Sequence, residues 1–591
     1  MNASIERRAC APALCTALTD RGSRPRGRRR WQTILVALLA LVALIGAACG
    51  DDDDASDTGA PDSSDNPAPQ DQDSDDELEP QSGGEITFGT YSEAISLDPV
   101  KMTGAGVTGA IELGAIYDTI VRWDPETRTY EMRTAESLTP NDDYSEWTLE
   151  LKAGIKFSDG TDYNAEAVVQ SIKRHQEPSN TTVSRQTSAI IKSMTVVDPL
   201  TVRFTLTEAW AGFPYVLTDK TAMIVSPAAL AKYGENFGNP GAYEGAGAGP
   251  FIVESYTPKE ALVLRKNPNY YGGGPYLDRI RFINIPGASL TYEALKAGEL
   301  QMAFLAEAPV TAQAIADGYP GYEAKVHGAN VLMFNHGAPI TCQGGKPEPK
   351  CTGQPDGATV PVETTTSMLD VRRALVTAID PDTLNMRAYE GKAQVGPELV
   401  KEGFPWYPAD ADRFEYDADK ARSYVEAAKA AGWDGKVRLI CPSTGIGPTV
   451  GQALEAMWEA VGIDVDVDTT KPVPQVVAQV HVQRDFDVAC LGLSVRADDG
   501  AVNQFSSRFK SGNPFGYSNP EMDRAISELR RAVTDEERTA AFKRVQDIFT
   551  QDAVAYPYAT TSELIAWDPK VHGPLPNTST TVMFDKTWIE H

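Results

Sequence analysis

The chain has 591 residues, of which 42% are hydrophobic, so it is long enough to bury the cores of more than one lobe. It carries 54 Lys and Arg against 82 Asp and Glu, a formal net charge of −28. An acidic surface repels phosphate backbones, so we expect no nucleic-acid partner.

Residues 1–48 form a basic segment that ends in an apolar run. Eight Arg stand there against one Glu and one Asp, and residues 34–48 are fifteen consecutive apolar or small residues. This length is typical of a signal-peptide core and short for a membrane-spanning helix. We therefore predict an export signal over residues 1–48. The pair Arg28 and Arg29 raises the alternative of twin-arginine export, although Gln32 stands where a further apolar residue is expected.

Small residues directly precede Cys49 and, with it, resemble the lipobox at which bacteria cleave a signal and attach lipid to the new N-terminal cysteine. Gly46 departs from the leucine usual three places before that cysteine. We expect a lipid on Cys49; an ordinary signal peptide cleaved nearby and an uncleaved anchor are the alternatives.

Residues 50–84 contain thirteen acidic residues and no Lys or Arg. Such a segment repels itself and stays solvated, which predicts a disordered tether over residues 49–84. A solubilising tail without a spacer role is the alternative.

Alternating hydrophobic patterns predict strands in the first half of the body. They cover residues 85–90, 147–151, 193–197, 201–206 and 279–285. The second and fourth of these have the alternation typical of antiparallel sheets.

Beyond residue 365 the pattern changes to helices that alternate with strands. Apolar residues recur at helical spacing over 371–379, 417–431 and 450–461, and strands are predicted over 436–441 and 463–468. Strand-helix-strand units favour a mainly parallel sheet. Near the end, Asn519 with Pro520 and Thr534 with Glu537 predict two helix starts.

Four cysteines remain in the body after the signal and Cys49 are set aside: Cys342, Cys351, Cys441 and Cys490. An even number in an exported chain predicts two disulfides, and we pair Cys342 with Cys351 and Cys441 with Cys490. Metal binding is the rival interpretation. No CxxC occurs, so we expect no metal.

Motifs of common catalytic sites are absent from the sequence, which contains no HExxH, GxSxG or GxxxxGK[ST]. The segment GAGVTG at residues 104–109 matches GxGxxG, but the preceding predicted strand ends near residue 90. A dinucleotide turn must leave its strand directly, so a glycine-rich loop or helix start is the better interpretation. We expect neither a cofactor nor catalytic activity.

Several segments, in order, resemble solute-binding protein family five, the extracytoplasmic peptide-binding and nickel-binding components of ABC importers. They include LKAGIKFSDGTDYNAEAV at 151–168, LRKNPNYYGGGPYLDRIRF at 264–282, MFN at 333–335, LDVRRALVTAID at 369–380 and YSNPEMDRAI at 517–526. The resemblance covers roughly residues 85–580.

This resemblance implies an α/β, two-lobed, periplasmic-binding-protein-like fold of type II, with an extra α+β subdomain in the first lobe. The expected boundaries are 85–120 and 201–310 for the first lobe, 121–200 for the subdomain, 311–565 for the second lobe, and 566–591 for a return to the first.

The resemblance also implies a function: capture of a solute between the lobes and delivery to ABC permease subunits with their ATPase. A peptide is the default solute, and another acidic small molecule is the second choice. We expect a monomer held by its lipid at the outer face of the bacterial cell membrane. A surface sensor of the same fold and an exported hydrolase are the alternatives.

The resemblance places ligand-binding residues after the first strand, at Tyr91, Ser92 and Glu93, and at Asn335. Strand ends face the crevice in open α/β sheets, which agrees with this placement. Tyr91 packed between the lobes without touching solute is the alternative.

One segment departs from the peptide-binding pattern. Where peptide-binding members have an Asp that pairs with the peptide ammonium, this chain has Arg496, and Leu493 replaces a Trp. A guanidinium holds a carboxylate by two parallel hydrogen bonds, so we predict that Arg496 binds an anionic group of the solute. Two alternatives stay open: a structural salt bridge of Arg496, and a two-residue shift that gives Asp498 the ammonium-binding role.

Overall fold

The structure is a computed structural model. It describes residues 78–90, 92–102, 109–177, 180, 183–324, 328–342, 349–494, 504–507, 513, 515–560, 562–578 and 580–591. The predicted signal, Cys49 and the tether up to residue 77 lie outside these residues.

A seven-stranded mixed sheet forms the core of what we call the first lobe, residues 78–324 and 562–591. Its strands, in spatial order, are β12 (Gly321–Glu323), β20 (Glu563–Trp567), β11 (Met302–Ala306), β1 (Glu85–Thr90), β10 (Arg279–Asn284), β9 (Ala261–Lys266) and β8 (Phe251–Thr257). β1 lies parallel to β10 and to β11, whereas the other neighbouring strands pair antiparallel. The sequence-based boundaries at 311 and 565 assign β12 and part of β20 to the second lobe, but both strands pair within this sheet.

Alternation along β1 sends Ile86 and Phe88 into the core of the first lobe, where both are fully buried. The Phe88 ring centroid lies 5.7 Å from that of Phe282 and 6.1 Å from that of Phe584. Strands from the start, middle and end of the chain therefore share one core. The helices of this lobe are α1 (Ala110–Tyr117), α4 (Pro227–Tyr233), α5 (Ala288–Lys296) and α6 (Ala308–Ala316).

A separate four-stranded sheet forms the subdomain of the first lobe. Its order is β4 (Ala135–Pro140), β5 (Glu146–Leu151), β7 (Thr201–Leu206) and β6 (Ile191–Asp198), and every neighbouring pair is antiparallel. The alternation predicted for residues 147–151 and 201–206 is confirmed, since Leu149 and Val202 are fully buried register partners. The helices α2 (Ala165–Gln176) and α3 (Val183–Ser188) belong to this subdomain.

The second lobe, residues 328–560, contains a five-stranded sheet. Its order is β17 (Asp464–Asp468), β16 (Lys436–Ile440), β18 (Val488–Ser494), β13 (Gly328–Phe334) and β19 (Ala555–Thr560). β16 lies parallel to both neighbours, as the strand-helix-strand unit predicts, but β13 is antiparallel to β18 and to β19. The expectation of a mainly parallel sheet is therefore wrong, because β13 and β19 come from segments outside that unit.

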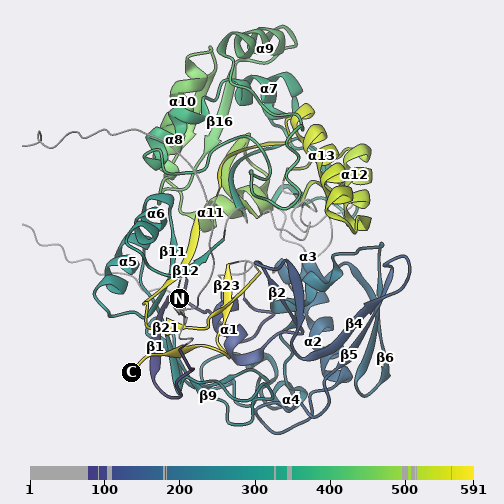
Figure 1. The fold of residues 1–591 in the computed structure, drawn as a ribbon. Helices are drawn as coiled ribbons and strands as arrows, with labels where there is room; N and C mark the ends of the chain where they lie inside the picture. Colours follow the sequence, from purple (N-terminus) through teal and green to yellow (C-terminus); the bar gives the residue numbers. More distant parts are fainter. Residues whose placement is uncertain are drawn as a thin grey trace, which may run out of the picture. The chain divides into compact units, whose positions relative to one another are not determined.

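Both faces of this sheet are buried. Along β13, Leu332 and Phe334 join one apolar cluster, while Val331 and Met333 join another. Seven helices of the second lobe are α7 (Leu369–Thr377), α8 (Pro381–Tyr389), α9 (Ala418–Ala430), α10 (Gly447–Glu459), α11 (Val473–Val477), α12 (Pro520–Arg531) and α13 (Asp535–Gln551). α12 and α13 lie side by side (Figure 1).

The predicted starts of α12 and α13 are confirmed. The Asn519 side chain accepts a hydrogen bond from the Glu521 amide, with Pro520 at the first helical position. Thr534 and Glu537 form a capping box. These caps satisfy backbone donors that a helix start otherwise leaves unpaired.

Shorter elements complete the described structure: β2 (Val121–Asp124), β3 (Thr129–Met132), β14 (Ile340–Thr341), β15 (Thr359–Val360), β21 (Val571–His572), β22 (Leu575–Asn577), β23 (Thr581–Met583), β24 (Trp588–Ile589), and the short helical segments η1 (Phe213–Leu217), η2 (Lys220–Ala222), η3 (Gly234–Asn236), η4 (Pro349–Cys351), η5 (Thr365–Ser367) and η6 (Ala478–Gln483). No helix within the described residues has the length and apolar character that crossing a lipid bilayer requires.

Candidate functional site

The carboxyl ends of β1, β10 and β11 meet at one edge of the seven-stranded sheet, because the three strands are parallel. The Asn284 side chain donates a 2.9 Å hydrogen bond to the Thr90 carbonyl, and the Thr90 hydroxyl donates to the Ser92 carbonyl at 3.1 Å. These bonds fix the backbone that carries Ser92 and Glu93 just beyond the sheet. The two predicted residues that the structure describes there thus lie at the carboxyl edge.

Glu93 lines a cavity of about 30 Å³ at this edge. The turn between β8 and β9 forms another side of it, and the Lys259 amide donates a hydrogen bond to the Glu93 carboxylate. Tyr256 also lines the cavity and donates a 2.5 Å hydrogen bond to the Ala94 carbonyl. Phe282 closes the apolar side.

Glu112, which sequence reasoning missed, lines the same cavity. It stands in the first turn of α1 and is only 1% exposed. Burial raises the pKa of its carboxyl to about 7, although a backbone hydrogen bond and the Lys220 charge act in the opposite direction. In sequence, one Glu inside the apolar segment AIELGAIY gives no sign of burial without a partner.

A second cavity, of about 200 Å³, lies between the two lobes. From the first lobe it is lined by the β2–β3 hairpin, and from the second by the segment between α8 and α9 and by the first turn of α13. Its lining residues are Trp123, Thr127, Arg128, Pro405, Trp406, Asp535 and Arg538. The Arg128 guanidinium lies 3.3 Å from the Asp535 carboxylate across this cavity.

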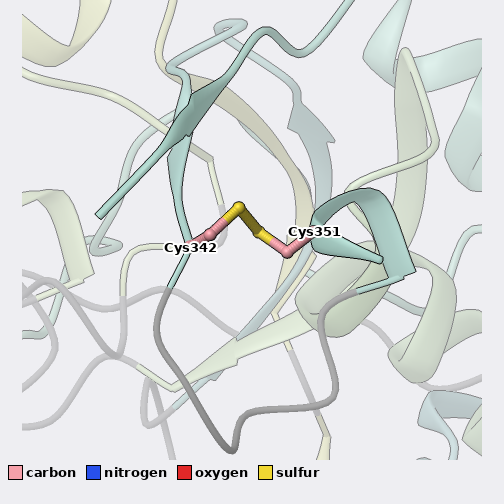
Figure 2. The surroundings of a disulfide bond; sticks show 2 residues. All are labelled: Cys342 and Cys351. Carbon is pink, nitrogen blue, oxygen red and sulfur yellow. A yellow bond between two sulfur atoms is a disulfide. The ribbon is translucent and has the colours of Figure 1, made fainter. Parts of the chain in front are cut away.

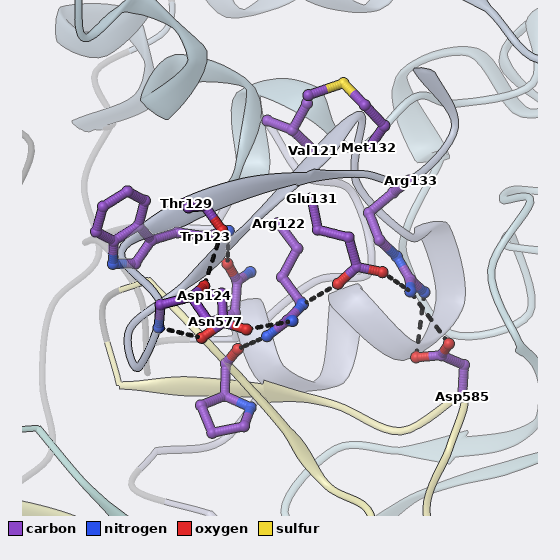
Figure 3. A network of polar contacts seen from close by, with 12 residues as sticks. Val121, Arg122, Trp123, Asp124, Thr129, Glu131, Met132, Arg133, Asn577 and Asp585 are labelled. Carbon is purple, nitrogen blue, oxygen red and sulfur yellow. Dashed lines mark hydrogen bonds and ion pairs between the residues drawn. The ribbon is translucent and has the colours of Figure 1, made fainter. Parts of the chain in front are cut away.

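A polar network holds the β2–β3 hairpin against the C-terminal segment (Figure 3). The Arg122 guanidinium donates to the Glu131 carboxylate at 2.6 Å and to the Pro576 carbonyl at 2.5 Å. The Trp123 amide donates to the Asn577 side chain at 3.0 Å. These bonds position the hairpin that carries Arg128 toward the second lobe.

Arg133 continues this network into the core of the first lobe. Its guanidinium lies 3.1 Å from the carboxylate of Asp118. It also lies 3.1 Å from the carboxylate of Asp585 (Figure 3). All three side chains are buried, and Tyr270 also donates to Asp118 at 2.8 Å. One buried guanidinium thus serves two buried carboxylates at the base of the hairpin, and the Tyr270 hydroxyl adds a hydrogen bond to one of them.

Another contact between the lobes joins the loop after β7 to α12. Glu208 forms an ion pair with Arg530, and the Ala211 amide donates a 2.9 Å hydrogen bond to the Arg530 carbonyl. The Arg530 guanidinium lies 5.8 Å from the Trp210 ring centroid. Arg530 is 4% exposed in its side chain, so this contact is desolvated.

Asn335 lies at the opposite edge of its sheet from the carboxyl ends of β16 and β18, since β13 runs antiparallel to β18. It is 1% exposed, and its side-chain amide donates to the carbonyls of Arg484 and Phe486 at 3.2 and 2.9 Å. These bonds order the second lobe, and a contact of Asn335 with solute stays a prediction.

Tyr91, Arg496 and Asp498 lie outside the described residues. The described part of β18 ends at Ser494, directly before the segment that contains Arg496 and Asp498. Their placement toward a solute stays a prediction.

The four body cysteines form two disulfides. Cys342 and Cys351 lie nine positions apart in sequence, and the bond between them closes a loop (Figure 2). Cys441, directly after β16, bonds to Cys490 on β18 with a Cα–Cα distance of 4.7 Å. The parallel pairing of these two strands brings both cysteines to one place in the sheet.

Among the described residues, no group of three or more His, Cys, Asp or Glu side chains is arranged to hold a metal ion. The carboxylates at the first-lobe edge, Glu93 and Glu112, do not make such a set. The cavity at the first-lobe edge is lined by carboxylates, by hydrogen-bonding groups and by aromatic rings. Such groups are typical of sites that bind organic solutes.

A comparison with known families matches residues 129–515, more than half of the chain, to "Bacterial extracellular solute-binding proteins, family 5 Middle". Among curated proteins, the glutathione-binding protein GsiB of Shigella dysenteriae serotype 1 is 26% identical over 437 residues. The match covers 72% of this chain and 79% of GsiB.

Solved structures show the same fold. The DppA protein of Helicobacter pylori, in complex with the peptide STSA, superposes with a TM-score of 0.69 at 22% identity over 86% of this chain and 99% of its own. The AgaA protein of Agrobacterium tumefaciens R10, in complex with agropinic acid, gives the same four values. The predicted fold class, a two-lobed α/β protein of the type II periplasmic-binding class, is confirmed.

Proposed function

The chain belongs to the bacterial extracellular solute-binding proteins of family 5, and from this membership we propose that it captures a solute between its lobes and delivers it to an ABC permease. Proteins of this family bind solutes and are not enzymes. The sequence-based expectation that the chain is not an enzyme is therefore confirmed, and so is the resemblance to this family.

The observation that carries the proposal is the set of contacts between the lobes. Glu208 with Arg530 and Arg128 with Asp535 pair side chains from different lobes, while the chain itself passes between the lobes after β12 and after β19. Lobes joined by short chain segments and paired through surface side chains can open and close around a ligand. Closure would bury a small solute and create the surface that a permease recognises.

A peptide is the solute that we propose first. Two relatives support this choice, since GsiB is a glutathione-binding protein and DppA was solved in complex with the peptide STSA. Agropinic acid in AgaA supports the alternative of another acidic small molecule. The proposed contacts are Tyr91, Ser92 and Glu93 from the first lobe, with Arg496 or Asp498 from the second.

We also propose that the protein works as a monomer on the outer face of the bacterial cell membrane. The lipobox-like residues before Cys49 support lipid anchoring, and the acidic composition of residues 50–84 supports a tether between lipid and body. Such a tether would leave the lobes free to move while it holds them near a permease.

Native mass spectrometry tests the capture step. The purified protein, stripped by partial unfolding and refolding, is loaded with a tryptic digest of casein and measured intact. One small molecule bound per chain, lost on denaturation, supports the proposal. Identical native and denatured masses after loading with the digest contradict a peptide solute, and the same result after loading with a total metabolite extract contradicts solute capture itself.

A further inference from the structure

Glu112 is a buried acid that the contacts within the fold do not explain. Its residue is 1% exposed, and its Oε2 atom has no hydrogen-bond partner in the described structure. A buried carboxyl oxygen without a hydrogen-bond partner costs free energy, and a group bound beside it is one way in which natural proteins compensate for that cost. Glu112 lines the 30 Å³ cavity at the carboxyl edge of the first sheet.

The charges around the cavity favour a cation. Glu93, Glu112 and Glu260 line it, against the single base Lys259. Lys220 of η2 is also buried and acts on Glu112 through its charge, but no salt bridge joins the two side chains in the described part of the chain. Glu93 adds a second carboxylate to the lining of the cavity.

The size of the cavity selects the kind of cation. A cavity needs roughly 10–15 Å³ for each water-sized group, so about 30 Å³ admits one or two such groups. A primary ammonium is of this size and has three donors, whereas a guanidinium is a wider, planar group with five. The rings of Tyr256 and Phe282 give walls that tolerate a cation and the methylene group attached to it.

We propose that this cavity binds a primary ammonium group, with Glu112 as its buried counter-ion and Glu93 as a second acceptor. The site follows from the geometry of the first lobe alone. Its use as a specificity subsite for a solute rests on the proposed function, since Ser92 and Glu93 would present the solute to it.

Thermal unfolding tests the site without any knowledge of the solute. The melting temperature is measured at pH 8, where Glu112 is ionised, in methylammonium chloride and in tetramethylammonium chloride at equal concentration. Wild type and the control Glu299→Gln, which alters an exposed acid of the same lobe, should melt at a higher temperature in methylammonium by about 2 °C or more. Glu112→Gln should lose this difference, and Glu93→Gln should reduce it.

Equal melting temperatures of the wild type in the two salts would overturn the proposal, because a cavity that holds only water does not distinguish them. A difference that survives in Glu112→Gln would overturn it as well. The wild-type measurement decides the matter even where a variant fails to fold.

Calorimetry then separates a solute ammonium from a free one. The peptides Ala-Lys-Ala and Ala-norleucine-Ala differ only in the ammonium of the middle side chain. If the subsite serves the solute, the lysine peptide should bind the wild type at least tenfold more tightly, and Glu112→Gln should lose this preference. Equal affinities overturn the subsite role. Binding of neither peptide, together with a methylammonium response, contradicts a peptide solute while it supports the ammonium site.

Discussion

Glu208 and Arg530 form an ion pair across the two lobes, although they lie 322 positions apart in sequence. The side chain of Arg530 is 4% exposed and that of Glu208 is 24% exposed. Paired charges that are largely out of water interact more strongly than surface pairs, because little solvent screens them. This pair forms only when the loop after β7 meets α12, so it contributes free energy to the state in which the lobes are together.

Glu208→Gln should weaken solute binding. The change keeps the shape of the side chain but removes the charge that pairs with Arg530, so the closed state loses part of its stabilisation. A loss of about 1.4 kcal/mol of binding free energy corresponds to a tenfold larger dissociation constant. Calorimetry with the solute identified by native mass spectrometry measures the change.

Arg128→Gln is the matched control for this prediction. Arg128 and Asp535 also pair across the lobes, but both side chains are about half exposed. Exposed ion pairs typically contribute between 0 and about 1 kcal/mol, so the dissociation constant should change less than with Glu208→Gln. Equal effects of the two variants would show that burial of the Glu208 pair is unimportant for closure.

The stability of the wild type should fall, relative to Glu112→Gln, as the pH rises from about 4.5 to about 7. The pKa of Glu112 is raised from its ordinary value of 4.5 to about 7 in the folded state, mainly by burial. The folded protein therefore holds this proton more tightly than the unfolded chain in that range, and the advantage is lost on deprotonation. The total change is about 3 kcal/mol.

Urea unfolding at several pH values in ammonium-free buffer measures this difference. Below pH 4.5 the gap between the two proteins should be constant, and above pH 7 it should be constant again. Parallel stability curves across the whole range would mean that Glu112 is solvated or paired in the folded protein.

Reduction should lower the melting temperature, mainly through the bond between Cys441 and Cys490. This disulfide encloses a loop of 49 residues, against nine for Cys342 and Cys351, and longer loops lose more entropy when closed. Disulfides typically contribute about 2–4 kcal/mol. The double variant Cys441→Ser with Cys490→Ser should therefore melt lower than Cys342→Ser with Cys351→Ser. Four alkylatable thiols in the denatured, unreduced protein would rule out both bonds.

Arg133→Met should destabilise the first lobe by about 3–5 kcal/mol, because it leaves the buried carboxylates of Asp118 and Asp585 without their common counter-ion. Lys156→Met is the control, since Lys156 pairs with Asp162 on the surface, where both side chains are largely exposed. Differential scanning calorimetry of both variants compares them. A melting temperature of Arg133→Met equal to that of the control would contradict a buried ionic network.

Cys49→Ala should release the protein from membranes into the soluble extracytoplasmic fraction. The lipid is the proposed anchor, and without it the acidic tether has no affinity for an anionic bilayer surface. Fractionation of cells that produce each form measures the change. Membrane retention of the Cys49→Ala protein, with a mass that includes residues 1–48, would favour an uncleaved anchor.

Local patterns predicted most of the elements. The alternation in residues 85–90 and 279–285 corresponds to β1 and β10, and the caps at Asn519 and Thr534 start α12 and α13. Each of these sequence patterns lies within one helical turn or one strand, so it can be recognised without knowing which other element the helix or strand packs against. Alternation does not specify direction, which explains why the parallel pairing of β1 with β10 was not predicted and why the antiparallel β13 was missed.

The site was harder to predict, because its contacts join distant segments. Ser92 and Glu93 were predicted from strand-end geometry and family resemblance, and the structure describes both at the carboxyl edge of the sheet. Asn335 shares that position after a strand, yet its strand runs in the opposite direction, so its end lies at the other edge and its amide serves the backbone. The residues next to Glu112 in sequence do not indicate that it is buried. Those next to Glu208 do not indicate that it pairs with Arg530.

Small-angle X-ray scattering tests solute capture by lobe closure most directly. The radius of gyration of the stripped protein is compared with that of the same protein saturated with the solute that native mass spectrometry identifies. The account predicts a smaller radius with solute, and a smaller decrease in Glu208→Gln at the same subsaturating solute concentration. An unchanged radius at saturating solute would contradict closure of the two lobes around it.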